Sequence, residues 1–217
     1  MQVRKMLLPT NKYKLKAPYA MNADCYVVHN TANDASANNE IKYMIGNSSQ
    51  TSCHYAIDDK EIVQAIPENR TAWHAGDLNG QGNMKGIGIE ICYSKSGGPR
   101  FIQAEKNAAK FIAQGLKEKG WGIDKVKKHQ DFSGKYCPHR TLDKGWDRFL
   151  NMIKAEMGQD KLTISINGNV KHINGHIKSG ISYAVIDKIE IPLRTLGEGL
   201  GFKVGWDAQN KVVVWND

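Results

Sequence analysis

The chain has 217 residues, of which 41% are hydrophobic, and this length fits one domain or one domain with a small second module. Five Trp and eight Tyr argue against a disordered chain, and no run approaches the ~18 apolar residues of a membrane-spanning helix, so we expect no membrane insertion. The net charge of +8 favours polyanionic partners in general, but no nucleic-acid-binding motif accompanies the scattered basic residues, so we do not expect nucleic acid as a partner.

The N-terminal segment, MQVRKMLLPTNKYKLK, lacks the ~7–15 residue apolar core of a signal peptide. We therefore expect a protein that is synthesised in the cytoplasm without a Sec-type export signal. A substrate outside the cytoplasm would require another route of release. In a reducing compartment a disulfide framework is not expected, so the four cysteines are interpreted mainly as small buried hydrophobic residues.

Strands are predicted where β-branched and apolar residues cluster, and helices where apolar residues recur at helical spacing. In chain order the predicted elements are a strand over 23–31, a helix over 38–47, strands over 52–58, 61–66 and 86–93, a helix over 103–120, a strand over 125–128 and a helix over 144–157. Gly120 ends the longest helix. The mixture predicts an α/β fold with a central mixed β-sheet flanked by helices.

The character of the chain changes near residue 158. We predict a catalytic domain over 1–157, a linker over 158–161 and a small α+β domain over 162–217. In the last of these, predicted strands flank a turn at 167–169 and a helix within 191–201. Leu193, Leu196 and Leu200 are expected on one face of that helix. A module of this size buries a limited core.

Three residues could form a metal site. A catalytic zinc site needs three protein ligands from His, Cys, Asp or Glu and leaves a position for water. His29 lies near the end of a predicted strand, His129 follows another, and Cys137 comes eight residues after His129 across a short loop. His-x7-Cys is a weak signal by itself, so ordinary buried histidines and an inert thiol remain open at this point.

Five motifs in order carry a resemblance to a known family. YVVHNTA, HYAID, WHAG, GIGIEICYS and HQDFSGKYCPHR resemble the N-acetylmuramoyl-L-alanine amidases of the type-2 amidase and peptidoglycan-recognition-protein superfamily, over about residues 20–155. The resemblance implies hydrolysis of the amide bond between N-acetylmuramic acid and L-alanine in bacterial peptidoglycan. It also implies one Zn²⁺ per chain, with His29, His129 and Cys137 as its ligands.

The same resemblance assigns two catalytic roles. Glu90 matches the glutamate that takes the proton of the attacking water, and burial of this strand residue would raise its pKa toward a useful range. Lys135 matches the lysine that stabilises the negative oxygen of the tetrahedral intermediate. A surface-facing strand residue is the alternative interpretation of Glu90.

Substrate contacts and ligand orientation follow less directly from the resemblance. His74 matches a residue that lines the substrate groove, and Trp73 is expected to help shape it, with core packing as the alternative for Trp73. His54 is expected either in the core or orienting a metal ligand or Glu90 through a hydrogen bond. Some family members have a tyrosine before this histidine, whereas here Cys53 precedes it, so the role of base rests on Glu90 alone.

The C-terminal segment IPLRTLGEGLGFKVGWDAQNKVVVW resembles the domain named after the N-terminal region of copper amine oxidases, over about residues 162–217. No copper site is implied. The resemblance is compatible with binding to the cell wall, including its anionic polymers, with self-association as a homodimer, or with a structural appendage.

Two rival functions stay open. A recognition protein of the same fold binds peptidoglycan without cutting it, typically after losing the cysteine ligand, and Cys137 is present here. A cysteine peptidase acting on the stem peptide would use a Cys–His pair, but Cys137 does not begin a helix that would activate it. Together with the missing export signal, the resemblance predicts a phage or prophage endolysin that reaches the wall after holin-type lysis.

Overall fold

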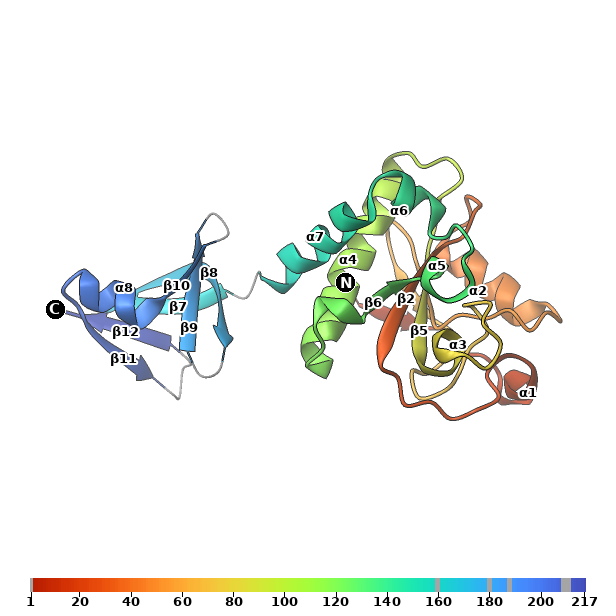
Figure 1. The fold of residues 1–217 in the computed structure, drawn as a ribbon, viewed down its shortest axis with the longest axis horizontal. Coiled ribbons are helices and arrows are strands. Elements are labelled where there is room, and N and C mark those ends of the chain that lie inside the picture. The colour runs from red at the N-terminus through yellow and green to blue at the C-terminus, as the bar shows by residue number, and fades with distance from the viewer. Residues whose placement is uncertain (1, 159–160, 179–180, 187–188, 208–211) are drawn as a thin grey trace. The chain divides into compact units, whose positions relative to one another are not determined.

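The computed structural model describes residues 2–158, 161–178, 181–186, 189–207 and 212–217 (Figure 1). The chain divides into two compact units, residues 1–154 and 155–217, and each is described by itself. The predicted linker includes residues 159 and 160, which lie outside the described part of the chain.

The first unit is built on a six-stranded sheet with the order β1-β4-β3-β5-β2-β6. Its strands are β1 (Val3–Lys5), β2 (Cys25–Asn30), β3 (Tyr55–Ile57), β4 (Ile62–Gln64), β5 (Gly86–Ile91) and β6 (Val126–Lys128). Neighbouring strands run parallel except for β3 and β4, which are antiparallel. The predicted central mixed sheet is therefore confirmed.

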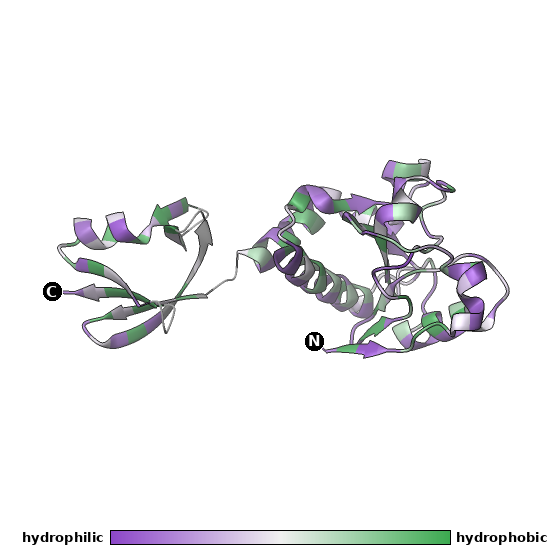
Figure 2. Ribbon diagram, turned by 90° about the horizontal axis from the view of Figure 1, so that it is seen from below, coloured by the Kyte–Doolittle hydropathy of each residue, from purple (hydrophilic) through white to green (hydrophobic). Residues whose placement is uncertain are grey.

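The first unit also contains helices (Figure 1). They are α1 (Tyr13–Lys16), α2 (Ala37–Gly46), α3 (Gln81–Lys85), α4 (Pro99–Lys119), α5 (Gln130–Ser133), α6 (His139–Asp143) and α7 (Trp146–Met157), with 3-10 turns at Thr10–Lys12 and Ile123–Lys125. The longest, α4, packs on β3 and β5, and hydrophilic and hydrophobic residues alternate along it (Figure 2). It ends as predicted at Gly120, which adopts a left-handed φ of 65°.

Burial explains the apolar character of the central strands. All six residues of β2 are buried, and so are five of the six residues of β5. A strand covered on both faces has no polar side to alternate with its apolar one, so it appears in the sequence as a nearly continuous apolar run. Polar residues that interrupt such a run, namely His29, Asn30 and Glu90, therefore need a specific reason to be there.

The second unit has its own six-stranded sheet, with the order β10-β9-β8-β7-β12-β11. Its elements are β7 (Lys161–Ile166), β8 (Asn169–Lys178), β9 (Ile181–Ile186), β10 (Ile189–Pro192), α8 (Leu193–Gly199), β11 (Lys203–Asp207) and β12 (Val212–Asn216). All pairs are antiparallel except β7 with β12. This confirms a small, β-rich α+β module.

One expectation for α8 is wrong. Leu193 is fully buried and Leu196 packs against the same core, but Leu200 is 62% exposed. The helix ends at Gly199, and Gly201 turns the backbone away with a φ of 89°, so Leu200 lies beyond the helical face. Glycine favours helix termination because it loses much conformational entropy in a helix and adopts positive φ without strain.

Helix hydropathy and the state of the cysteines can be examined directly. Within the described residues, no helix combines the length and apolar character needed to cross a membrane. Cys25, Cys53, Cys92 and Cys137 are all buried free thiols.

Candidate metal centre

Two neighbouring parallel strands bring His29 and His129 together. Val28 of β2 pairs with Lys128 of β6, and each histidine is the next residue along its strand direction. The His129 backbone N–H donates to the Val28 carbonyl at 3.3 Å, which continues the ladder by one step. Because both strands run the same way, the two imidazoles emerge at the same edge of the sheet.

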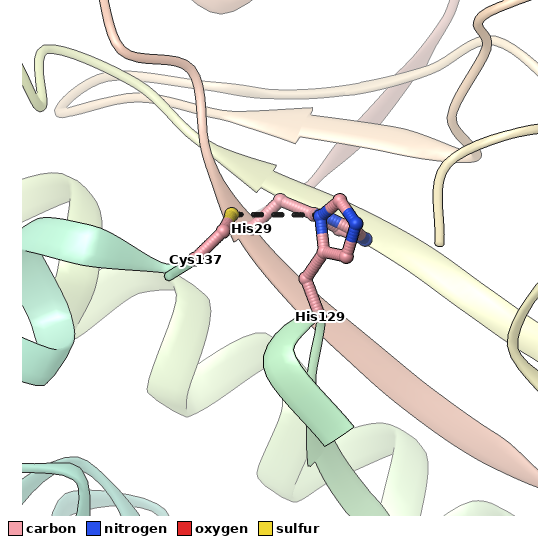
Figure 3. Close-up of side chains that lie close together, drawn as sticks. All are labelled: His29, His129 and Cys137. Atoms are coloured by element: carbon pink, nitrogen blue, oxygen red, sulfur yellow. Dashed lines mark hydrogen bonds between the residues drawn. The ribbon is translucent and has the colours of Figure 1, made fainter. Parts of the chain in front are cut away.

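A short loop returns Cys137 to the same point. The N–H of Gln130, the first residue of α5, donates to the Cys137 carbonyl at 3.0 Å and closes the loop. The sulfur then lies 3.9 Å from His29 Nδ1, and the Nδ1 atoms of His29 and His129 are 2.9 Å apart (Figure 3). Ligand atoms of all three residues lie within 4.8 Å of one another, although the residues span 108 positions.

This donor set fits zinc. Two imidazole nitrogens and one thiolate are typical of catalytic zinc sites, which leave the fourth position open. With ordinary bond lengths, tetrahedral coordination puts such ligand atoms about 3.3–3.6 Å apart. The distances of 2.9 Å and 3.9 Å lie on either side of that range, so sub-ångström shifts would suffice. All three side chains are buried, which limits the rotamers open to them.

The protonation of these groups suits metal binding. Burial, followed by the charges of neighbouring histidines and of Lys135, holds the pKa of His29 well below its usual value, so the ring stays neutral. Burial raises the pKa of the Cys137 thiol to about 11, even though the backbone N–H groups of Asn30 and His139 hydrogen-bond to the sulfur and oppose the shift. A bound cation would displace that thiol proton.

Glu90 lies beside the cluster. It is the register partner of His29 in the parallel pair of β5 and β2. Its Oε2 is buried and has no hydrogen-bond partner among the described residues. Burial raises the pKa of Glu90 to about 8, and the nearby Glu40 carboxylate adds to the shift while Lys135 opposes it. A carboxyl group with such a pKa exchanges protons readily near neutral pH.

Lys135 is the cation of the site. Its side chain is exposed in the loop between α5 and Cys137. Its positive charge lowers the pKa of His29, His129, Cys137 and Glu90, so its ammonium group lies within electrostatic reach of them all. The structure thus brings the three predicted ligands together and pairs Glu90 with His29 in the sheet, while Lys135 lies within electrostatic reach of them.

His74 is held by contacts with the protein itself. This side chain is only 7% exposed, and both of its ring nitrogens contact protein atoms. Nδ1 is 3.0 Å from His29 Nε2, and Nε2 is 3.1 Å from the Gly86 carbonyl oxygen. His74 therefore lies against His29, and a contact of His74 with the substrate stays a prediction.

His54 is a core residue that bonds to backbone. Its Nδ1 accepts the Gly88 N–H at 2.9 Å, and its Nε2 lies 2.8 Å from the Arg70 carbonyl oxygen. Burial lowers its pKa to about 4. Within the described residues it makes no hydrogen bond to a predicted metal ligand or to Glu90, so the orienting role considered for it is not seen.

Trp73 is half-buried, with Tyr19 edge-on at 6.4 Å between ring centroids. Its indole Nε1 is buried and has no hydrogen-bond partner among the residues the structure describes. A substrate contact for Trp73 stays a prediction.

Sequence reasoning missed Asn30. Its Oδ1 accepts the backbone N–H groups of Arg140 and Thr141, and its amide donates to the His29 carbonyl. The side chain thereby ties the first turn of α6 to the strand that carries His29. A buried asparagine directly after a candidate ligand was the available signal. Glu40, which raises the pKa of Glu90 from α2, carried no such signal.

Comparison with known protein families shows to which family the chain belongs. Residues 19–140 match the family model described as N-acetylmuramoyl-L-alanine amidase. The chain belongs to this amidase family. Residues 142–215 also match the model described as the copper amine oxidase N-terminal domain, as the sequence predicted.

Two curated relatives of the chain come from Bacillus subtilis strain 168. It is similar to the N-acetylmuramoyl-L-alanine amidase XlyB, with 54% identity over 187 residues, which cover 83% of this chain and 59% of XlyB. It is also similar to the N-acetylmuramoyl-L-alanine amidase CwlA, with 60% identity over 158 residues, which cover 72% of this chain and 58% of CwlA. The chain thus spans less than two thirds of the length of these relatives.

Solved structures resemble the first unit. PlyL is similar with a TM-score of 0.69 and 48% identity, over 70% of this chain and 97% of that one. The catalytic domain of XlyA is similar with a TM-score of 0.64 and 37% identity, over 70% of this chain and 99% of that one. These similarities agree with the predicted fold of helices around a mixed sheet.

Proposed function

We propose that this amidase hydrolyses the amide bond between N-acetylmuramic acid and L-alanine in bacterial peptidoglycan, using one zinc ion held by His29, His129 and Cys137. The observation that carries the proposal is the convergence of two imidazole nitrogens and one sulfur beside the half-buried side chain of Glu90. Family membership supplies the substrate class.

The ligand residues hold the metal, while other residues transfer protons and stabilise negative charge. Bound zinc supplies Lewis acidity, which makes a water more acidic and polarises the substrate carbonyl. Glu90 accepts the proton of the attacking water and delivers it to the leaving nitrogen. Its raised pKa suits both transfers, because near neutral pH both the protonated and the ionised forms of the carboxyl group are populated.

Lys135 stabilises the developing negative charge. The scissile carbonyl oxygen becomes an oxyanion when the water adds, and a fixed positive charge nearby lowers the energy of that state. Lys135 already exerts its charge on the ligands and on Glu90. Trp73 is proposed to contact the sugar or the stem peptide beside this point.

The cysteine-peptidase alternative is disfavoured by the state of Cys137. A nucleophilic cysteine needs a depressed pKa, because the thiolate is the reactive form. Here burial raises the pKa of Cys137 to about 11. Retention of the cysteine in the cluster likewise favours a hydrolase over a protein that only binds peptidoglycan.

The biological setting is part of the proposal. We propose that the protein is a phage or prophage endolysin that is made in the cytoplasm and reaches the wall after holin-type lysis. Expression in a susceptible bacterium, with and without a co-expressed pore-forming holin, tests this. Lysis that requires the holin supports the proposal, and lysis without it contradicts it.

For the second unit we propose binding to the cell wall, through peptidoglycan or its anionic polymers, or self-association as a homodimer. Sedimentation with purified walls, before and after removal of anionic polymers, tests the first role. Analytical ultracentrifugation of the full chain tests the second. A monomer that leaves the walls unbound would contradict both roles.

The central experiment measures zinc content together with cleavage of purified peptidoglycan. We expect one zinc per chain and new alanine amino termini, which disappear on chelation and return with zinc. The Glu90→Gln variant is the matched control, because it should keep zinc and lose cleavage. Cleavage that survives complete removal of zinc, or new reducing sugar ends in place of amino termini, would overturn the proposal.

A further inference from the structure

A chain of hydrogen bonds leads from a backbone carbonyl to the candidate metal site. The Gly86 carbonyl oxygen lies 3.1 Å from Nε2 of His74. A carbonyl oxygen can only accept, so this nitrogen must carry a proton. In a neutral imidazole the other nitrogen is then bare, which makes Nδ1 of His74 an acceptor.

The contact between His74 and His29 fixes the position of the proton on the His29 ring. Nδ1 of His74 lies 3.0 Å from Nε2 of His29. Because the His74 atom accepts, the His29 atom must donate, which places the proton of His29 on Nε2. Nδ1 of His29 is left with its lone pair, and it is this atom that faces Nδ1 of His129 and the sulfur of Cys137.

We propose that His74 is a positioning residue that selects the Nε2–H tautomer of His29 and so presents Nδ1 to the metal. The proposal rests on the proposed zinc site. It assigns His74 a role that involves no contact with substrate. A ring nitrogen whose partner nitrogen is fixed by a hydrogen bond is a better-oriented metal ligand than one that must choose its tautomer on binding.

The surroundings hold His74 in the required orientation. The backbone N–H groups of His74 and Ala75 both donate to Asn83 Oδ1 at 2.8 Å, which fixes the loop before α3. On the other side, a Cβ at Gly88 of β5 would lie 2.6 Å from the imidazole Cδ2 of His74. Only glycine at that strand position leaves room for the ring, so the packing itself places His74 against His29.

His54 offers a matched comparison. It is as deeply buried as His74, its ring also bonds to two protein atoms, and the two rings lie 5.9 Å apart between centroids. Both of its partners are backbone groups, of Gly88 and Arg70. Loss of His54 therefore removes a similar number of buried hydrogen bonds without touching the tautomer of His29.

The test compares zinc affinity, by competition with a chromogenic chelator, in His74→Leu, His74→Asn and His54→Leu. We expect His74→Leu to weaken zinc binding about 10- to 100-fold, in line with the loss of other such partners of metal ligands. His74→Asn keeps an acceptor near the place of Nδ1 and should recover most of the affinity. The His54→Leu variant should keep the zinc affinity of the wild type even if its thermal stability falls.

A second measurement needs no variant and reads the tautomer directly. Two-bond ¹H–¹⁵N correlation spectra of the zinc-free wild type, in a chelating buffer, distinguish Nε2–H from Nδ1–H rings. We expect His74 and His29 both in the Nε2–H form. The Nδ1–H form of His29, or equal zinc affinity in His74→Leu and wild type, would overturn the inference. A wild type that binds no zinc would instead overturn the proposed function.

Discussion

His29 and Glu90 are register partners on the neighbouring parallel strands β2 and β5. Paired residues of adjacent strands point to the same face of a sheet, so the carboxyl group of Glu90 and the imidazole of His29 project side by side. The sheet therefore sets the relation between a candidate ligand and a candidate base without any contribution from a loop. This rigidity is what a catalytic pair requires.

Substitution of Glu90 should change how stability depends on pH. The folded-state pKa of Glu90 is raised from 4.5 to about 8, so the folded protein holds this proton more tightly than the unfolded chain. This contribution to the free energy of unfolding is complete below pH 4.5 and is lost as the pH rises through 8. Glu90→Gln should therefore match the wild type at the acid end and exceed it at the alkaline end.

Denaturant unfolding of both proteins in chelating buffer, across that pH range, measures the difference. Other titrating groups are common to the two proteins and cancel in the comparison. Parallel stability curves for the wild type and the Glu90→Gln variant would contradict the prediction.

Two buried cysteines provide a matched pair for the metal site. Cys137 belongs to the ligand cluster, whereas Cys25 begins β2 at the end away from His29. Both substitutions to alanine remove one buried thiol that otherwise packs as a small hydrophobic group. Elemental analysis should find that Cys137→Ala loses bound zinc and that Cys25→Ala retains one ion per chain. Equal zinc content in the two variants would remove Cys137 from the ligand set.

An ion pair ties α4 to α7. Arg148 donates to Glu105 Oε2 at 2.6 Å, and the Glu105 side chain is 2% exposed. Arg148→Met should lower the free energy of unfolding by about 3 kcal/mol, because it leaves a buried carboxylate without its partner. The double variant Arg148→Met with Glu105→Gln removes the charge as well and should recover part of the loss. Urea unfolding followed by circular dichroism gives both values, and full additivity of the two substitutions would contradict the pairing.

Helix α4 also depends on a close approach to β2. A Cβ added at Gly115 would lie 1.9 Å from the hydroxyl oxygen of Tyr26. Gly115→Ala should lower the free energy of unfolding by about 1–3 kcal/mol through overpacking, even though alanine favours a helix. Tyr26→Phe removes the nearest clashing atom, so the double variant should be less destabilised than the sum of the single ones. A stabilised Gly115→Ala protein would show that α4 does not approach β2 this closely.

Much of the fold could be predicted from periodicity. The helix predicted over 103–120 and the strand predicted over 23–31 are confirmed as α4 and β2, because long apolar stripes and buried β-branched runs are strong signals. The short helices α3, α5 and α6 were not predicted. They have four or five residues each, which is too short to show a helical period. Leu200 was misplaced because the flanking glycines end α8 earlier than its apolar spacing suggests.

The site divides in a similar way. His29, His129 and Cys137 could be chosen because each follows a recognisable strand or loop within a family motif. The tautomer relay through His74 could not be predicted, since it depends on a contact between residues 45 positions apart and on the carbonyl of a third segment. Sequence patterns indicate which residues are polar and buried. They do not indicate which nitrogen of a ring meets which neighbour.

The sheet order also sets when a metal can be acquired. β6 is the last strand of the first sheet along the chain, yet it pairs with β2 from its start. A chain still emerging from the ribosome and ending before Val126 holds five of the six strands but only one of the three candidate ligands. Under the proposed function, the complete set of three ligands therefore exists only after translation has passed Cys137, and a chain that ends earlier would lack activity.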